Sequence, residues 1–213
     1  MSIVLKSISE AISRIEYLLD QSKDRVVIGV VGKPGAGKST FTAELIKNLS
    51  DIKPTLVPMD GYHLSNSQLA SLGLSDRKGA FNTFDATGYV NLLRRINSES
   101  NTDIYFPVFH REIEESYAAD GVVKAGSKLV ITEGNYLLFD QGGWQAVKAE
   151  LTEAWFIKVD DQIRVDRLIK RHELYGKDKQ SAILWATGSD EINAKAVENN
   201  IVKADVIIDS SAF

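Results

Sequence analysis

The clearest chemistry of this chain lies in one glycine-rich stretch, GKPGAGKST, at residues 32–40. It satisfies the pattern G-x-x-x-x-G-K-[ST], in which the glycines allow a tight turn that points backbone N–H groups at phosphate oxygens. Lys38 is expected to reach the β- and γ-phosphates, and the Ser39 hydroxyl to bind Mg²⁺. The residues predicted to hold the nucleotide are Gly32, Lys33, Pro34, Gly35, Ala36, Gly37, Lys38, Ser39 and Thr40.

This loop does not by itself separate kinases from other nucleotide-binding proteins. A GTPase needs Asn or Thr before Lys-x-Asp, but IKVD at 157–160 has Ile157 there. A motor ATPase usually ends an apolar strand in Asp-Glu, whereas KLVITEG at 128–134 has Thr132 before Glu133. Both classes are therefore disfavoured. A nucleotide-binding regulator, or an ATPase without a small-molecule acceptor, stays open as the alternative to a kinase.

A second chemical feature follows the run TLVPMD, which reads as a strand at 55–60. Asp60 ends this run, and a carboxylate there can point into the crevice beside the γ-phosphate and accept a hydroxyl proton. The alternative is a turn residue or a helix cap. Tyr62 and His63 come directly after it and either line the same pocket or serve as packing groups.

Elements that could position these residues alternate along the chain. Short β-branched runs at 25–31, 55–60, 103–109, 128–134, 154–160 and 204–209 read as strands, and 39–49, 86–97, 143–150, 161–174 and 191–199 read as helices. Several strands are apolar on both faces, as parallel strands covered by helices must be. The pattern predicts a single α/β domain over residues 1–213, with a doubly wound, mostly parallel sheet. Ligands bind such sheets beyond the carboxyl ends of the strands.

Composition excludes several classes. The chain has 213 residues, a net charge of −4 and no cysteine, which disfavours nucleic-acid binding, disulfides and thiolate catalysis. Charged residues interrupt the apolar pattern of the first twenty residues, so this segment reads as an amphipathic packing helix rather than a signal peptide or membrane span. We expect a cytoplasmic protein without a membrane or nucleic-acid partner. A homodimer is an open possibility.

Seven stretches, in this order, resemble the uridine kinase, phosphoribulokinase and pantothenate kinase superfamily of P-loop kinases. They span residues 26 to 209 and read GKPGAGKST, PMDGYH, KGAFNTFDATG, FPVFHRE, VITEGNYLL, RLIKRH and ADVIID. The resemblance implies a P-loop NTPase fold with a small helical lid at about 164–182. It also implies ATP and Mg²⁺ as cofactors, and transfer of the γ-phosphoryl group to a hydroxyl of a small metabolite.

The same resemblance implies roles for individual residues. Asp60 matches the general base and a possible Mg²⁺ partner. Glu133 matches an acidic residue that holds Mg²⁺ through water, its alternative being hydrogen bonds to the phosphate loop. Asp85 is the candidate for binding acceptor hydroxyls or for capping the next helix. Arg111 matches an acceptor-site arginine, the alternative being a surface ion pair, and Asn135 is a further pocket candidate.

Three arginines of the run RVDRLIKRH, Arg164, Arg167 and Arg171, lie three and four residues apart and so share one helix face. By resemblance this segment is the lid, whose Arg167 and Arg171 close on the ATP phosphates and stabilise the charge that develops during transfer. The alternatives are a solvated basic face and an RNA-binding surface. The following YGKDKQ, at 175–180, has the composition of a mobile hinge.

Departures from the family pattern leave the acceptor open. Uridine kinases typically read Asp-Ser-Phe-Tyr where this chain has DGYH, and pantothenate kinases, which read Asp-Gly-Phe, carry longer N-terminal regions. EGNYLL also differs from the uridine kinase pattern EGI. These differences fit a less characterised branch that includes sugar kinases. A nucleoside, pantothenate and a sugar therefore all remain candidates.

Overall fold

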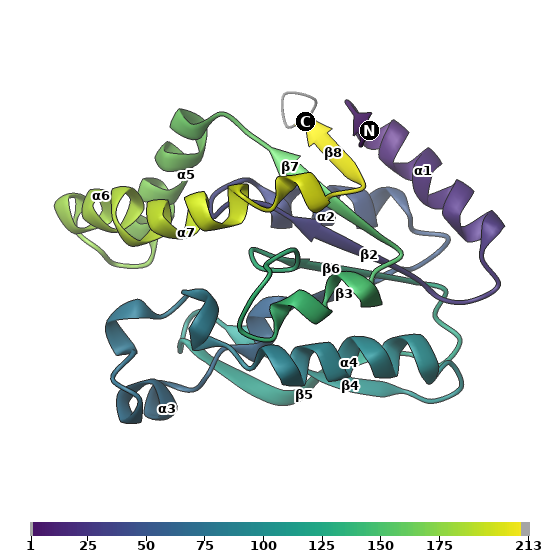
Figure 1. Ribbon diagram of the computed structural model, residues 1–213, viewed down its shortest axis with the longest axis horizontal. Coiled ribbons are helices and arrows are strands. Elements are labelled where there is room, and N and C mark those ends of the chain that lie inside the picture. The colour runs from purple at the N-terminus through teal and green to yellow at the C-terminus, as the bar shows by residue number, and fades with distance from the viewer. Residues whose placement is uncertain (1, 210–213) are drawn as a thin grey trace.

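The computed structural model describes residues 2–209 and has a six-stranded, fully parallel sheet at its centre (Figure 1). The strands, in spatial order, are β1 (Ile3–Leu5), β8 (Val206–Asp209), β7 (Glu153–Lys158), β2 (Val26–Val31), β6 (Leu129–Gly134) and β3 (Thr55–Pro58). The predicted parallel α/β fold is confirmed. The short edge strand β1 was not predicted, because three residues next to a helix give no periodic signal.

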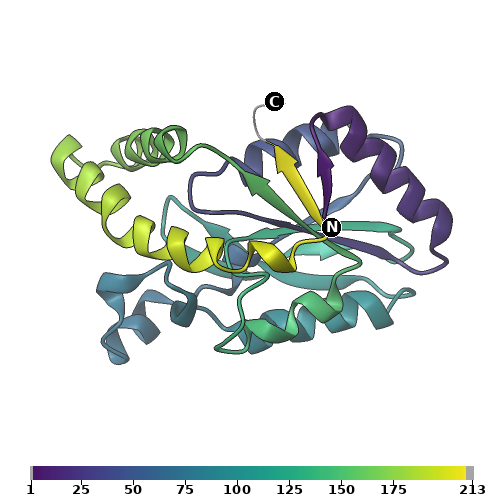
Figure 2. The ribbon, with the colours of Figure 1, turned by 45° about the horizontal axis from the view of Figure 1, so that its top comes forward.

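Helices cover both faces of the sheet, which explains why β2 is buried along its whole length. On one face, α1 (Ile8–Gln21) and α2 (Lys38–Asn48) pack against Ile28 and Val30, and on the other, α4 (Ala86–Ser98) packs against Val27 and Val31. Figure 2 shows these two layers on opposite sides of the strands. The N-terminal helix is thus the packing element that its apolar spacing predicted.

Two predicted elements differ in the structure. The strand predicted at 103–109 is β4 (Ile104–His110), which lies outside the main sheet and pairs antiparallel with β5 (Glu115–Val123). Tyr105 is exposed and Phe106 buried, so β4 has the alternation of a half-covered hairpin rather than of a core strand. The sequence 143–150 forms two short 3-10 turns, Trp144–Ala146 and Lys148–Glu150, instead of one helix, and Gly143 precedes the first turn with a positive φ.

Three helices follow β7 and overhang one side of the sheet: α5 (Asp161–Leu174), α6 (Lys179–Thr187) and α7 (Ser189–Glu198). Part of the predicted hinge is helical, since Asp178 caps α6 by accepting a hydrogen bond from the backbone of Ser181. The short helix α3 (Asn66–Ser71) lies on the other side of the same end of the molecule (Figure 1). Within residues 2–209 no helix is long and apolar enough to cross a membrane.

Candidate active site

A cavity of about 780 Å³ opens at the carboxyl ends of the central strands, where parallel α/β sheets bind ligands. The predicted site residues that line it are Pro34, Gly35, Gly37, Lys38, Ser39, Thr40, Asp60, His63, Arg111, Glu133, Asn135, Arg167 and Arg171. The predicted residues that do not line it are Gly32, Lys33, Ala36, Tyr62 and Asp85. Residues as far apart in the sequence as Pro34 and Arg171 therefore converge on one site.

The phosphate loop connects β2 to α2 in the conformation that its glycines allow. Gly35 and Gly37 have φ values of 79° and 90°, and a Cβ at Gly35 would lie 2.7 Å from a backbone oxygen of α5. Lys38 Nζ donates to Gly32 O (3.0 Å) and to Asn135 Oδ1 (2.6 Å). Burial lowers the pKa of Lys38 to about 8. The lysine is therefore positioned by protein oxygens that a phosphate would replace.

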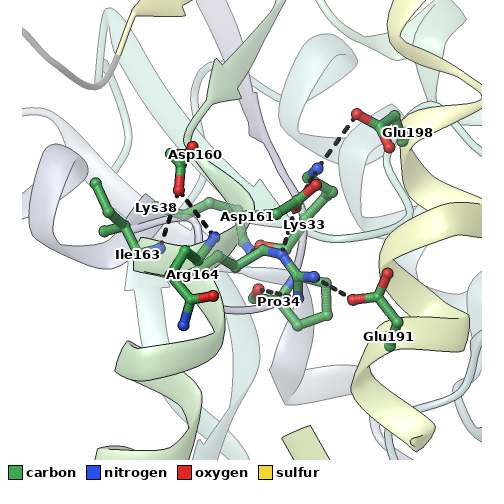
Figure 3. A network of polar contacts seen from close by, with 10 residues as sticks. Lys33, Pro34, Lys38, Asp160, Asp161, Ile163, Arg164, Glu191 and Glu198 are labelled. Carbon is green, nitrogen blue, oxygen red and sulfur yellow. Dashed lines mark hydrogen bonds and ion pairs between the residues drawn. The ribbon is translucent and has the colours of Figure 1, made fainter. Parts of the chain in front are cut away.

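Lys33 points away from the cavity, although its neighbours in the loop line it. Its ammonium is buried and pairs with Asp161 (2.7 Å) and Glu198 (3.2 Å), which belong to α5 and α7 (Figure 3). Only its backbone remains for a phosphate. The side chain instead attaches the loop to the two helices above it.

Arg164 extends the same network. Its side chain is completely buried, pairs with Asp161 (3.0 Å) and Glu191, and donates to Pro34 O at 3.5 Å (Figure 3). The first arginine of the basic helix face is therefore a structural residue. It fixes the beginning of α5, so the predicted lid of 164–182 is anchored at its start.

We expect Arg164→Met to lower the free energy of unfolding by about 2 kcal/mol, because Glu191 and the carbonyl of Pro34 lose a charged hydrogen-bond donor, whereas Asp161 keeps Lys33 as partner. The exposed neighbour Lys170, changed to Met, is the control and should have little effect. Urea denaturation measures both. Equal stability of the two variants would contradict the structural role of Arg164.

Glu133 lies at the end of β6 and accepts hydrogen bonds from two hydroxyls of α2. Ser39 Oγ donates to one carboxylate oxygen (2.7 Å) and Thr42 Oγ1 to the other (2.8 Å). A hydroxyl and a carboxylate beside a phosphate loop are oxygen ligands of the kind that Mg²⁺ prefers. No group of three or more metal-binding side chains occurs within residues 2–209. Phosphate oxygens and water would therefore complete the coordination, as is usual for Mg²⁺.

Asp60 follows β3 and pairs with Arg111 Nη2 at 2.9 Å. Arg111 follows β4 of the hairpin, and the hairpin reaches Asp60 because Gly61 has no side chain: a Cβ there would lie 2.0 Å from Pro107 O. The surface pair between Arg111 and Glu112 or Glu115 is not formed, since Glu112 contacts His110 and Glu115 accepts from a backbone N–H. Arg111 thus orients Asp60 in the cavity.

Arg171 faces the cavity without a partner. It is half-buried, and its guanidinium makes no hydrogen bond or ion pair with any of residues 2–209. Burial lowers its pKa, and the charge of Arg111 lowers it further. Lys38, Arg111 and Arg171 all line this cavity. Because the Arg171 guanidinium has no partner within residues 2–209, its charge is available to an anion bound here.

Arg167 has a separate position, over the phosphate loop. It is exposed, and Nη1 is 3.5 Å from Ala36 O. The structure therefore gives the three arginines of one helix face three different environments.

His63 stacks between Phe84 and Phe109, with ring centroids 4.0 Å and 4.7 Å away. Its Nδ1 is buried without a hydrogen-bond partner in the described chain. Burial lowers the pKa of His63 to about 4; Asp60 raises it, and Lys78 and Arg111 lower it. His63 is therefore a neutral ring at physiological pH.

The low pKa of His63 predicts a loss of stability in mild acid. Below pH 6.5 the unfolded chain binds a proton at His63 that the folded protein refuses until about pH 4. The free energy of unfolding should consequently fall by about 3 kcal/mol across this range, relative to a His63→Gln variant. Urea denaturation at several pH values measures the difference.

NMR titration is the direct check, with His110 as internal control. Hydrogen bonds to Asp120 and Glu112 raise the pKa of His110, so the two rings should titrate in opposite directions from 6.5. A pKa near 6.5 for His63 would contradict the conclusion that burial lowers it.

Tyr62 and Asp85 take the alternative roles considered from the sequence. Tyr62 packs edge-on against Tyr89, with ring centroids 5.5 Å apart, and burial raises its pKa to about 12. Asp85 caps α4 by accepting a hydrogen bond from Gly88 N at 2.8 Å. Neither residue lines the cavity.

Sequence reasoning missed part of the cavity wall. The missed residues include Ser75, Lys78, Phe109, Glu114, His172, Trp185, Ser189, Asp190 and Asn193. Lys78 lies within the family-like stretch KGAFNTFDATG, which was a usable signal. The residues of α6 and α7 belong to no motif, so only the packing of these helices brings them to the site.

This fold and site define a P-loop kinase. The chain belongs to the phosphoribulokinase / uridine kinase family, whose profile matches residues 27–212. The family predicted from the sequence is confirmed, and membership supports an ATP-dependent phosphotransferase acting on a small molecule.

Relatives with different names share this architecture. A Schizosaccharomyces pombe protein named "Putative uridine kinase" is 30% identical over 216 residues, which cover 96% of this chain and 91% of the relative. The crystal structure of a "putative fructose transport system kinase" from Silicibacter sp. TM1040 is 32% identical, covers 94% of this chain and 98% of its own, and has a TM-score of 0.86. A D-glycerate 3-kinase from Cryptococcus neoformans shares the fold alone, with 11% identity, a TM-score of 0.69 and coverage of 97% and 96%.

Proposed function

We propose that this protein is an ATP- and Mg²⁺-dependent kinase that transfers the γ-phosphoryl group to a hydroxyl of a small metabolite. The observation that carries the proposal is the position of Asp60. This carboxylate lines the same cavity as Lys38 of the phosphate loop and as the unpartnered Arg171. A nucleotide-binding regulator has no need of an acceptor pocket with an oriented carboxylate, and the acceptor dependence of ATP consumption separates a kinase from an ATPase.

In the donor half, the phosphate loop would bind the ATP phosphates through its backbone N–H groups and Lys38. Ser39 and Glu133 would hold Mg²⁺, which when bound neutralises charge on the β- and γ-phosphates. Thr42 keeps the Glu133 carboxylate oriented through its 2.8 Å hydrogen bond. Arg167 would reach the phosphates from above the loop.

In the acceptor half, Asp60 would accept the proton of the attacking hydroxyl. Arg111 occupies one oxygen of Asp60, which leaves the other free for the hydroxyl. The new O–P bond forms as the bond between the γ-phosphorus and the β–γ bridging oxygen breaks, and ADP leaves. Lys38 and Arg171 would stabilise the negative charge spread over the transferred group.

The names of the relatives suggest two acceptors for this chain, uridine and fructose. Pantothenate is a third candidate from the sequence. We also propose a cytoplasmic location, where ATP is available.

A phosphorylation screen tests the proposed function. The purified full chain is incubated with γ-labelled ATP and Mg²⁺, together with nucleosides, pantothenate, sugars or hydroxy acids. We expect one class to accept label and to stimulate ATP consumption, and Lys38→Met to abolish both. Slow hydrolysis at one rate with every compound would overturn the proposal.

A further inference from the structure

Two walls enclose the half of the cavity beyond Asp60. One wall comes from the segment before α4 and from the hairpin turn, and includes Ser75, Lys78, Gly79, Phe109 and Glu114. The other comes from the end of α6 and the start of α7, and includes Trp185, Ser189, Asp190 and Asn193. In Figure 1 these segments lie on the two sides of the end of the molecule that carries α3 and α6.

Asp190 and Asp60 line the cavity from different elements. Asp190 belongs to α7, whereas Asp60 follows β3. Tyr136 lies behind the first wall, because its hydroxyl donates a hydrogen bond to Gly79 O at 2.7 Å. Burial raises the pKa of Tyr136, and the charges of Asp190 and Asp60 raise it further. The first part of α7 therefore lines the same cavity as the proposed base.

Most charges of this half are already paired. Asp60 pairs with Arg111 (2.9 Å) and Asp190 with His172 (2.7 Å). Lys78 is held by the backbone and the carboxylate of Glu114. An anionic acceptor would have to compete with these partners, or to take Arg171 away from the transferred phosphoryl group. The pairing favours a neutral acceptor.

Several aromatic rings that line the cavity already have a ring or a cation as partner. The ring of Phe84 stacks on His63. The ring of Phe109 also contacts His63, and Lys78 Nζ lies 5.2 Å from the centroid of the Phe109 ring. Lys177 Nζ lies over Trp185 at 4.5 Å. A nucleobase is usually held by stacking on an aromatic face. Tyr175 also lines the cavity but is 57% exposed.

Uncharged polar groups on both walls have free hydrogen-bonding capacity. The side chains of Ser75, Ser189 and Asn193 line the cavity and make no hydrogen bond with any of residues 2–209. A hydroxyl and an amide both donate and accept, as the hydroxyls of a polyol do. The carboxylates of Asp190 and Glu114 line the same cavity and add acceptors.

We propose that the acceptor is a neutral, non-aromatic polyhydroxyl compound, a sugar or sugar alcohol, bound between Asp190 and Asn193 of α7 and the wall of Ser75, Lys78 and Glu114. This rests on the proposed kinase function and narrows its substrate class. The α7 residues determine specificity, because a site built to hydrogen-bond hydroxyls strongly rejects compounds that lack them.

An acceptor panel tests the substrate class. Pentoses, hexoses and hexitols are compared with nucleosides and with the hydroxy acids glycerate and pantothenate, using the full chain, ATP and Mg²⁺. We expect a polyol to have a kcat/KM at least tenfold above every other class. A nucleoside or hydroxy acid as best substrate would overturn this inference but leave the kinase function standing. No labelled product from any class would overturn both.

Variants of α7 test the binding site. Asn193→Ala and Asp190→Ala should each raise the KM for the polyol about tenfold or more, with a smaller change in kcat and an unchanged KM for ATP. Lys195→Ala, exposed on the same helix, is the matched control. Because Asp190 also pairs with His172, Asn193 is the cleaner position, and thermal unfolding checks that each variant is folded. An unchanged acceptor KM in both variants would overturn the proposed contact.

Discussion

Replacement of Asp60 by Asn is expected to abolish phosphoryl transfer while ATP still binds. Asn keeps the size of the side chain and can still contact Arg111, but it accepts no proton from the acceptor hydroxyl. General bases contribute about 10²–10⁴-fold to rate, so kcat should fall by that factor. ATP affinity should change little, because Lys38 and the loop backbone bind the phosphates independently of Asp60. Calorimetry with ATP and the labelled-product assay measure the two quantities.

The matched control is Asp51→Asn, which changes an exposed carboxylate away from the cavity. It should leave kcat and ATP affinity unaltered. If the Asp60→Asn variant still transferred the phosphoryl group, Asp60 would not be the general base. Loss of ATP binding together with transfer would give Asp60 a structural role instead.

Arg171→Gln is expected to lower the kcat of phosphoryl transfer strongly, with little change in ATP affinity. Arg171 is the cation of the lid helices that enters the cavity without a partner within residues 2–209. Its charge is therefore available to the transferred phosphoryl group. Positive charges of this kind are worth on the order of 10³-fold in kcat or more. ATP affinity should fall much less, because the loop and Lys38 supply most of the ground-state binding.

The neighbouring residue provides the control. Lys170 is exposed on the same helix. Lys170→Gln therefore also removes one positive charge from the protein, but it leaves Arg171 in the cavity. A similar loss of kcat in both variants would mean that only general electrostatics is involved. A loss confined to ATP affinity would place Arg171 in ground-state binding rather than in the transition state.

Much of the donor half could be predicted from local sequence. Glycines at 35 and 37 are needed for positive φ, and a strand that is apolar on both faces precedes them, so a few consecutive residues determine the turn and its ligand. The alternation of apolar strand runs with helical patterns similarly predicted the parallel α/β fold. These features depend on neighbours in the chain, which is why they can be read without coordinates.

The basic helix marks the limit of such reasoning. Spacing placed Arg164, Arg167 and Arg171 on one face, and they do follow one another along α5. Their environments differ, because Arg164 pairs with α7, Arg167 lies over the phosphate loop, and the unpaired guanidinium of Arg171 lines the cavity. Helical periodicity predicts on which face of the helix a side chain lies, but not which other residues that side chain contacts.

The sequence by itself determined the phosphate loop, the fold class and the presence of an acidic residue after β3. Only the tertiary structure decided that Arg111 pairs with Asp60, that the side chain of Lys33 pairs with α5 and α7, and that α7 lines the cavity. The physical reason is sequence separation: Asp60 and Arg111 are 51 residues apart, and Lys33 and Glu198 are 165 apart. Contacts of that range depend on how whole helices and hairpins pack, which no local pattern of side chains encodes.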